Sequence, residues 1–368
     1  MQIDKIEQVH IRMQLKHPFE TSFGVQQAID KIILAVHAGG LTGWGESPVS
    51  AAPGYSYETV ETAWHIQHDF LIPALRGADI DQPGDLGPLF GRVRGHAMAK
   101  AGLEAAVWDL LAKARDVSLH RLLGGTRAQV PVGVSIGVQK DLDALRERVE
   151  SFVEAGYRRV KVKIKPGWDV APVEALRADF PETAIMADAN SAYTLDDAMT
   201  IKRLDPFDLL MIEQPLAHDD LLDHAALQRD IATPICLDES IHSVARAREA
   251  IALGSCRVIN IKPARVGGWA NAKMIHDLGV AHGLDLWVGG MLESGVGRAH
   301  NLALAALPGM SLPGDISGTD RYWHQDIIDH VFAVNPDGTM DVPDGPGIGV
   351  QVDRARLAAL AVRSSETT

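Results

Sequence analysis

Five charged residues recur at a nearly constant spacing through the second half of the chain. They are Lys163, Asp188, Glu213, Asp238 and Lys262. Neighbours are separated by 25, 25, 25 and 24 residues, which is the length of one strand-plus-helix unit. Each follows a short apolar run such as AIMA or PICL. The repeat therefore predicts equivalent positions at the ends of successive strands.

The three acidic members of this series predict a metal site. An unpaired buried charge is very costly, so charges at strand ends indicate chemistry rather than packing. The carboxyl ends of parallel strands are also where the active sites of barrel enzymes form. Carboxylates on neighbouring strands repel one another, and a hard divalent cation relieves that repulsion. We therefore expect Asp188, Glu213 and Asp238 to hold Mg²⁺ or Mn²⁺, which favour oxygen ligands.

The two lysines predict acid–base catalysis on a carboxylate substrate. They belong to the second and sixth strands, which face each other across an eight-stranded barrel. A metal-bound carboxylate would present its α-carbon between them, so that Lys163 and Lys262 could remove a proton from one face and return it to the other. The metal would stabilise the enediolate. A lysine base must be uncharged, so we expect a lowered lysine pKa. Structural ion pairs around the wall are the alternative, but five residues in register favour catalysis.

The surrounding sequence predicts the elements that position these residues. An early pair of strand-like runs is followed by helical periodicity over residues 57–114. From residue 130 onward, seven β-rich runs alternate with helical stretches, and an eighth run begins at Met310. Sequential βα units favour a closed parallel barrel over an open sheet. Short strands and turns return from about Arg321.

Composition excludes several classes of function. With 35 basic and 48 acidic side chains and a net charge of −13, nucleic acid and anionic membranes are poor partners, because both require clustered basic residues. The two cysteines, Cys236 and Cys256, lack zinc-site spacing. The first residues lack a signal-peptide pattern, and no run approaches the roughly 18 apolar residues of a membrane span. We expect a soluble cytoplasmic protein acting on a small carboxylate.

Longer motifs around these residues resemble the enolase superfamily. They are KVK at 161–163, MADAN, MIEQP, CLDES and NIKPARVGG. The chain is similar to the muconate-lactonising branch, and within it to the o-succinylbenzoate synthase and N-succinylamino acid racemase group. The resemblance implies an α/β fold, namely a modified TIM barrel of (β/α)7β type with an α+β capping domain. It implies a cap over residues 1–128, a barrel over 129–320 and a C-terminal segment, 321–368, that returns to the cap. We also expect a homo-oligomer.

The resemblance further implies roles for residues beside the charged series. Lys161 would neutralise the substrate carboxylate. Arg265 would lower the pKa of Lys262, which favours racemisation, although a structural salt bridge is the alternative. Glu239 would position Lys262 or the metal ligands. The expected substrate-binding residues are Ser135, Asn190, Met291, Leu292, Phe19, Phe23 and Tyr55. For the three aromatic residues, ordinary packing between cap and barrel is equally compatible with the sequence.

Two reactions remain open at this stage. An N-acylamino acid racemase, an isomerase, needs both lysines as acid and base. An o-succinylbenzoate synthase, a lyase of menaquinone biosynthesis, needs one lysine as base and then acid, while the other holds the enediolate as a cation. One protein could catalyse both. A Schiff-base aldolase would also use a sixth-strand lysine, but three carboxylates count against it.

Overall fold

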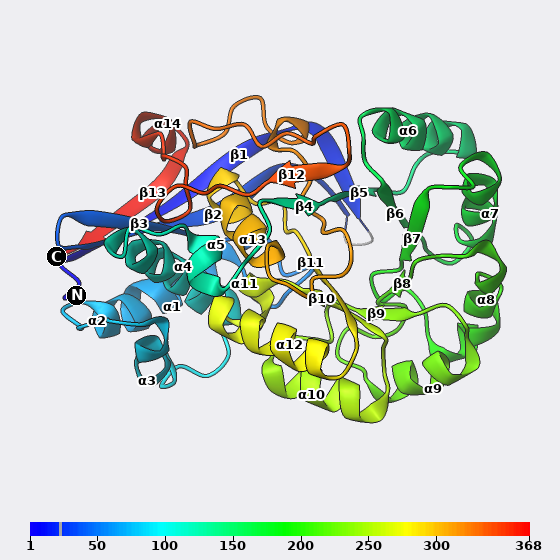
Figure 1. Ribbon diagram of the computed structural model, residues 1–368, viewed down its shortest axis with the longest axis horizontal. Coiled ribbons are helices and arrows are strands. Elements are labelled where there is room, and N and C mark those ends of the chain that lie inside the picture. Colours follow the sequence, from blue (N-terminus) through cyan, green and yellow to red (C-terminus); the bar gives the residue numbers. More distant parts are fainter. Residues whose placement is uncertain (22–23) are drawn as a thin grey trace.

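The cap is built on an antiparallel sheet that contains both ends of the chain. The computed structural model describes residues 1–21 and 24–368. Four strands lie in the order β13-β1-β2-β3. They are β1 (Lys5–Thr21), β2 (Gly24–Ala38), β3 (Leu41–Ser47) and β13 (Ala361–Thr367). Because β13 pairs antiparallel with β1, the termini lie near each other in Figure 1.

Helices cover this sheet, and the longest of them is its main packing partner. The helices of this part are α1 (Val60–Ile66), α2 (Ile72–Leu75), α3 (Leu86–Phe90), α4 (Ala97–Ala114) and α5 (Leu119–Leu123). Helix α4 is apolar on nearly all sides and buried along most of its length, as expected of a core helix. Its backbone lies directly against β3, because a Cβ on Gly45 would lie only 2.1 Å from the carbonyl oxygen of Gly102.

Seven parallel strands form the wall of the barrel, each beside the next along the chain. They are β5 (Gly133–Ile136), β6 (Arg159–Lys163), β7 (Ala184–Asp188), β8 (Ile212–Glu213), β9 (Ile235–Leu237), β10 (Val258–Ile261) and β11 (Asp285–Val288). Figure 1 shows the intervening helices along the outside. These are α6 (Leu142–Glu154), α7 (Val170–Asp179), α8 (Ala198–Lys202), α9 (Leu222–Asp230), α10 (Val244–Leu253) and α12 (Trp269–Ala281).

An irregular segment occupies the eighth position of the barrel, where the sequence predicts a strand beginning at Met310. On one side, the N–H groups of Ser311 and Asp315 donate to carbonyl oxygens of β11 at 3.0 and 2.9 Å. On the other side, the N–H of Gly133 in β5 donates to Gly314 at 2.8 Å. Pro313 has no N–H to donate, so a regular ladder cannot form there. The segment still joins β11 to β5 and completes the ring.

Two buried glutamates of the cap hold the barrel helices that face it. Glu46 at the end of β3 accepts hydrogen bonds from the N–H and the hydroxyl of Ser294, at the start of α13 (Gly295–Ala305). Lys31 of β2 lies 3.2 Å from Glu46, and both side chains are fully buried. Glu104 of α4 accepts from the N–H of Ala270 in α12 at 2.8 Å. Acidic groups at helix N-termini are favourable, because several backbone N–H groups there lack partners.

The C-terminal part of the chain contacts the barrel before it reaches the cap. It contains η5 (Thr319–Arg321), β12 (Thr339–Asp341) and α14 (Arg354–Ala359). Strand β12 pairs antiparallel with β4 (Gln129–Pro131), and only β13 joins the cap sheet. No helix in the described part of the chain is long and apolar enough to cross a membrane.

Candidate active site

The five charged residues of the repeat gather at the carboxyl ends of the barrel strands. Lys163, Asp188 and Glu213 are the last residues of β6, β7 and β8, and they are paired in register across those strands. Asp238 and Lys262 directly follow β9 and β10. The common strand-end position predicted from the spacing is therefore observed.

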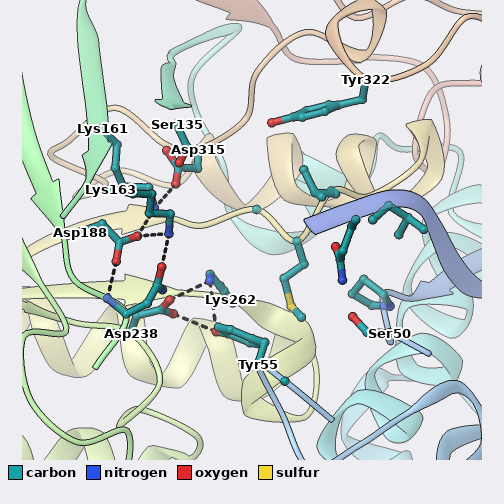
Figure 2. Close-up of a pocket in the computed structure, with 18 of the residues that line it drawn as sticks. Ser50, Tyr55, Ser135, Lys161, Lys163, Asp188, Asp238, Lys262, Asp315 and Tyr322 are labelled. Atoms are coloured by element: carbon teal, nitrogen blue, oxygen red, sulfur yellow. Dashed lines mark hydrogen bonds and ion pairs between the residues drawn. The ribbon is translucent and has the colours of Figure 1, made fainter. Parts of the chain in front are cut away.

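One group of ion pairs is centred on Lys161. Its ammonium nitrogen lies 2.5 Å from Asp315, 2.8 Å from Glu213 and 3.2 Å from Asp188, and Lys163 lies 2.6 Å from Asp188. Figure 2 shows Lys161, Lys163, Asp188 and Asp315 facing one another. Burial lowers the pKa of Lys161, but the three carboxylates outweigh burial and raise it. Burial raises the pKa of Asp188, but the two lysines bring it below its usual range.

A second group of contacts surrounds Lys262. Its ammonium nitrogen lies 2.8 Å from Asp238 and 3.1 Å from the hydroxyl of Tyr55. Arg265 donates to Asp238 and, at 3.1 Å, to the same hydroxyl. Burial lowers the pKa of Lys262, but Tyr55 and Glu213 more than offset burial, so the net shift is upward. The lowering expected of a lysine base depends on a nearby cation and stays a prediction, because the groups closest to the amine here are acidic.

Amides beside the carboxylates fix their orientation. Asn260 donates to Glu213 at 2.6 Å. Asn190 donates from its backbone to Asp188 at 3.0 Å and from its side chain to Glu239 at 3.1 Å. Its φ of 41° is a left-handed conformation that asparagine tolerates better than most residues. Burial and the nearby Asp188 raise the pKa of Glu239.

The buried oxygens of this site fit a hard divalent cation. Asp188, Glu213 and Asp238 are buried on neighbouring strand ends, and the other oxygen of Glu239, Oε2, is buried without a hydrogen-bond partner. Among the side chains that the structure describes, no three acidic, histidine or cysteine groups form a ready cation cage. Asp188, Glu213 and Asp238 contact lysine or arginine side chains in this arrangement. An all-oxygen set of this kind suits Mg²⁺ or Mn²⁺.

A cavity of about 320 Å³ lies between these strand ends and the cap, within the size range of small-molecule sites. Its wall includes the expected residues Ser135, Lys161, Asn190, Met291, Leu292 and Tyr55, together with Lys163, Asp188, Asp238 and Lys262. Glu213, Glu239 and Arg265 are buried near the site and do not line it. Phe23 and the side chain of Phe19 lie outside the residues whose placement the structure describes.

Asp315, Arg298 and Tyr322 are among the residues of this cavity that were not anticipated from the sequence. Asp315 ends the irregular eighth segment and contacts both Lys161 and Arg159. The sequence does carry a signal for Asp315, because this acidic residue follows the eighth apolar run, in the motif GDIS, as the other charged residues follow theirs. Arg298 and Tyr322 also line the cavity. Neither has a periodic signal in the sequence, because tertiary packing alone brings them there.

Fold and site together define a capped-barrel enzyme with lysines and carboxylates at the barrel mouth. Residues 5–124 match the model of the mandelate racemase / muconate lactonizing enzyme N-terminal domain. Residues 144–356 match the enolase C-terminal domain-like model. The chain thus belongs to the enolase superfamily, in the branch of muconate lactonizing enzyme. The predicted family and barrel fold are confirmed. Members of this superfamily use a divalent metal and act on small carboxylates.

Relatives are similar over nearly the whole chain. An o-succinylbenzoate synthase from Geobacillus stearothermophilus is 53% identical over 349 residues, covering 95% of this chain and 93% of the relative. An N-succinylamino acid racemase from Thermus thermophilus is 48% identical over 352 residues, covering 96% and 95%. The crystal structure of an enolase superfamily member from Listeria innocua has a TM-score of 0.96 at 42% identity, covering 100% of this chain and 99% of that one.

Proposed function

We propose that this chain is an N-acylamino acid racemase that acts on N-succinylamino acids. The observation that carries the proposal is the placement of two lysines in one cavity. Lys163 ends β6 and Lys262 directly follows β10, with three strands between β6 and β10, and both lysines line the same space. A substrate held there has one amine on each side. The relative named N-succinylamino acid racemase supports this assignment.

The charges of the side chains indicate which residues would bind the substrate and which would bind the metal. Lys161 would contact the substrate carboxylate. Asp188, Glu213 and Asp238 would hold Mg²⁺ or Mn²⁺. The cation would supply positive charge beside the substrate carboxylate, where negative charge develops as the α-proton leaves.

Racemisation then consists of two proton transfers at one carbon. The neutral amine of one lysine takes the α-proton, and the C–H electron pair remains on the substrate. The protonated amine of the other lysine gives a proton to the opposite face, which inverts the centre. Asn190 and Tyr55 are hydrogen-bonded to Lys163 and Lys262 respectively, so each would orient its amine. A lysine must lose its proton before acting as base, and contacts with carboxylates oppose that loss.

The second candidate is dehydration to o-succinylbenzoate. It needs one lysine as base and then acid, while the other stays charged. The contacts of Lys262 with Asp238 and Tyr55 at 2.8 and 3.1 Å favour a charged amine. The relative named o-succinylbenzoate synthase also supports this candidate. Because the same cavity accommodates both reactions, one protein can carry both.

Proton exchange tests the proposal directly. We expect the wild-type protein in D₂O with Mg²⁺ to exchange the α-proton of both enantiomers of an N-succinylamino acid. The loss of the α-proton signal is monitored by ¹H NMR. Lys163→Ala and Lys262→Ala should each abolish racemisation. The loss is measured by polarimetry, as an optical rotation that no longer changes with time. Lys165→Ala, which removes an exposed lysine two residues beyond Lys163, is the matched control and should remain active. Full racemisation by either active-site variant would contradict the two-base mechanism.

Assays of both reactions on the wild-type protein separate the two candidates. Dehydration is followed by the absorbance of the aromatic product. A wild-type protein that forms o-succinylbenzoate but leaves N-succinylamino acids unracemised would favour the synthase and reject the racemase.

A further inference from the structure

Arg298 is a buried cation on the cavity wall whose guanidinium makes no hydrogen bond or ion pair with the described side chains. It lies near the start of α13, its side chain lines the cavity, and the residue is only 2% exposed. Its Nε is buried without a hydrogen-bond partner. Within the described part of the chain, its guanidinium donates no hydrogen bond and forms no ion pair. Leaving such a group unpaired is costly.

The other cations of the cavity differ from Arg298 in this respect. Lys161, Lys163 and Lys262 each lie within 3.2 Å of a carboxylate. Arg298 instead lies over the ring of Tyr322, 5.6 Å from its centroid. An aromatic face attracts a guanidinium and leaves its N–H groups free to point outward.

Asp326 is an acidic residue whose carboxyl interacts electrostatically with Arg298, and one of its oxygens is already hydrogen-bonded to the backbone. Arg298 lowers the pKa of Asp326, although burial gives that carboxyl a net upward shift. One oxygen of Asp326 accepts from the N–H groups of Gly295 and Ile327 at 2.9 and 2.7 Å. It makes no ion pair with Arg298 among the described contacts. The other oxygen of Asp326, Oδ2, is buried without a hydrogen-bond partner in the described part of the chain. Because it does not accept from Arg298, the N–H groups of the guanidinium can still bind a ligand.

We propose that Arg298 binds a second carboxylate of the substrate, at the far end of its N-acyl group. This inference rests on the proposed function, which places the reacting carboxylate beside Lys161. A guanidinium binds a carboxylate through two parallel N–H···O bonds. A succinyl group ends in a carboxylate, whereas an acetyl group does not. The substrate is thus a dicarboxylate whose two ends contact Lys161 and Arg298.

Substrate selectivity tests this assignment. We would measure kcat/KM for the N-succinyl and N-acetyl derivatives of one amino acid and compare their ratio between proteins. Arg298→Met removes the charge and keeps much of the volume, so the ratio should fall about 10- to 100-fold, mainly through a higher KM for the succinyl substrate. Arg298→Lys keeps the positive charge but cannot form two parallel hydrogen bonds to a carboxylate. Its selectivity ratio should therefore lie between those of wild type and Arg298→Met.

Arg321 offers a matched control beside the same tyrosine. Its guanidinium already donates to the hydroxyls of Tyr322 and Ser317 and to the carbonyl of Ser135. Arg321→Met should leave the selectivity ratio within about twofold of wild type, because those bonds go to protein acceptors. An equal loss for both substrates in Arg298→Met would overturn the proposal, since it would indicate a structural role.

A binding measurement separates this proposal from the proposed function. Calorimetric titration with N-succinylglycine and N-acetylglycine requires no turnover. If wild type racemises nothing, the proposed function fails. A preference for N-succinylglycine that disappears in Arg298→Met would still support the second carboxylate site. Equal affinity of wild type for the two ligands would reject that site.

Discussion

Replacing Glu46 with Gln should destabilise the protein strongly, because the change leaves a buried ammonium group without its counter-charge. Lys31 lies 3.2 Å from Glu46, and neither side chain is exposed. In the wild type, Glu46 accepts hydrogen bonds from the N–H groups of Ser294 and Gly297, each at 3.1 Å. A glutamine can still accept both. Most of the loss is therefore electrostatic. Breaking a buried pair from one side costs about 3–5 kcal/mol.

Thermal unfolding gives the expected shift in Tm. At about 2.1 cal/mol/K per residue, a chain of 368 residues has an unfolding entropy of about 0.8 kcal/mol/K near its Tm. A loss of 4 kcal/mol then lowers Tm by about 5 °C, measured by differential scanning calorimetry. The Mg²⁺ concentration must be held constant, since a ligand bound only to the native state raises Tm.

A double-mutant cycle tests the electrostatic reasoning itself. Lys31→Met combined with Glu46→Gln removes both charges, so the double variant should be at least about 2 kcal/mol more stable than the sum of the single effects predicts. Lys273 and Asp277 form an exposed pair at 2.8 Å and serve as control, with an expected coupling of about 0.3–0.5 kcal/mol. Additive effects of the Lys31 and Glu46 substitutions would refute the reasoning.

Three other outcomes are expected. Chelation with EDTA should abolish α-proton exchange and added Mg²⁺ should restore it; undiminished exchange after exhaustive chelation would count against a metal enzyme. Burial raises the pKa of Glu104 to about 7, so the native state binds the proton more tightly than the unfolded state and wild type loses stability as pH rises from about 4.5 to about 7. Relative to Glu104→Gln, wild type should lose up to about 1.4 kcal/mol per pH unit in that window; a constant difference in Tm across it would disprove the assignment. Asp315→Asn takes a counter-charge from both Arg159 and Lys161, so kcat/KM should fall at least about tenfold, and unchanged kinetics would argue that Asp315 is dispensable.

The repeat of charged residues was predictable because every βα unit places its strand end at the same edge. The regular strand predicted at the eighth unit does not form, because Pro313 interrupts the ladder and Asp315 ends an irregular segment. The hydrogen bond between Lys262 and Tyr55 was not predictable in this way either. Tyr55 comes from the cap, 207 residues earlier in the chain, and its contact with Lys262 is created by the tertiary fold alone.

Several expectations stay predictions. The domain limits at residues 128 and 320 are among them, as are the homo-oligomer and the cytoplasmic location. The pairing of β12 with β4 connects the segment expected to return to the cap with the start of the expected barrel. The contribution of Phe19 and Phe23 to closing the cavity also stays a prediction.

The pairing of β13 with β1 has a consequence for how the protein is made. Synthesis produces β1 first, yet its partner on the outer side, residues 361–367, is the last strand of the described chain to leave the ribosome. Throughout translation β1 is an edge strand with unpaired backbone groups, the kind of surface on which nascent chains aggregate. The whole barrel is synthesised during that interval, so its units can fold before the cap sheet is complete.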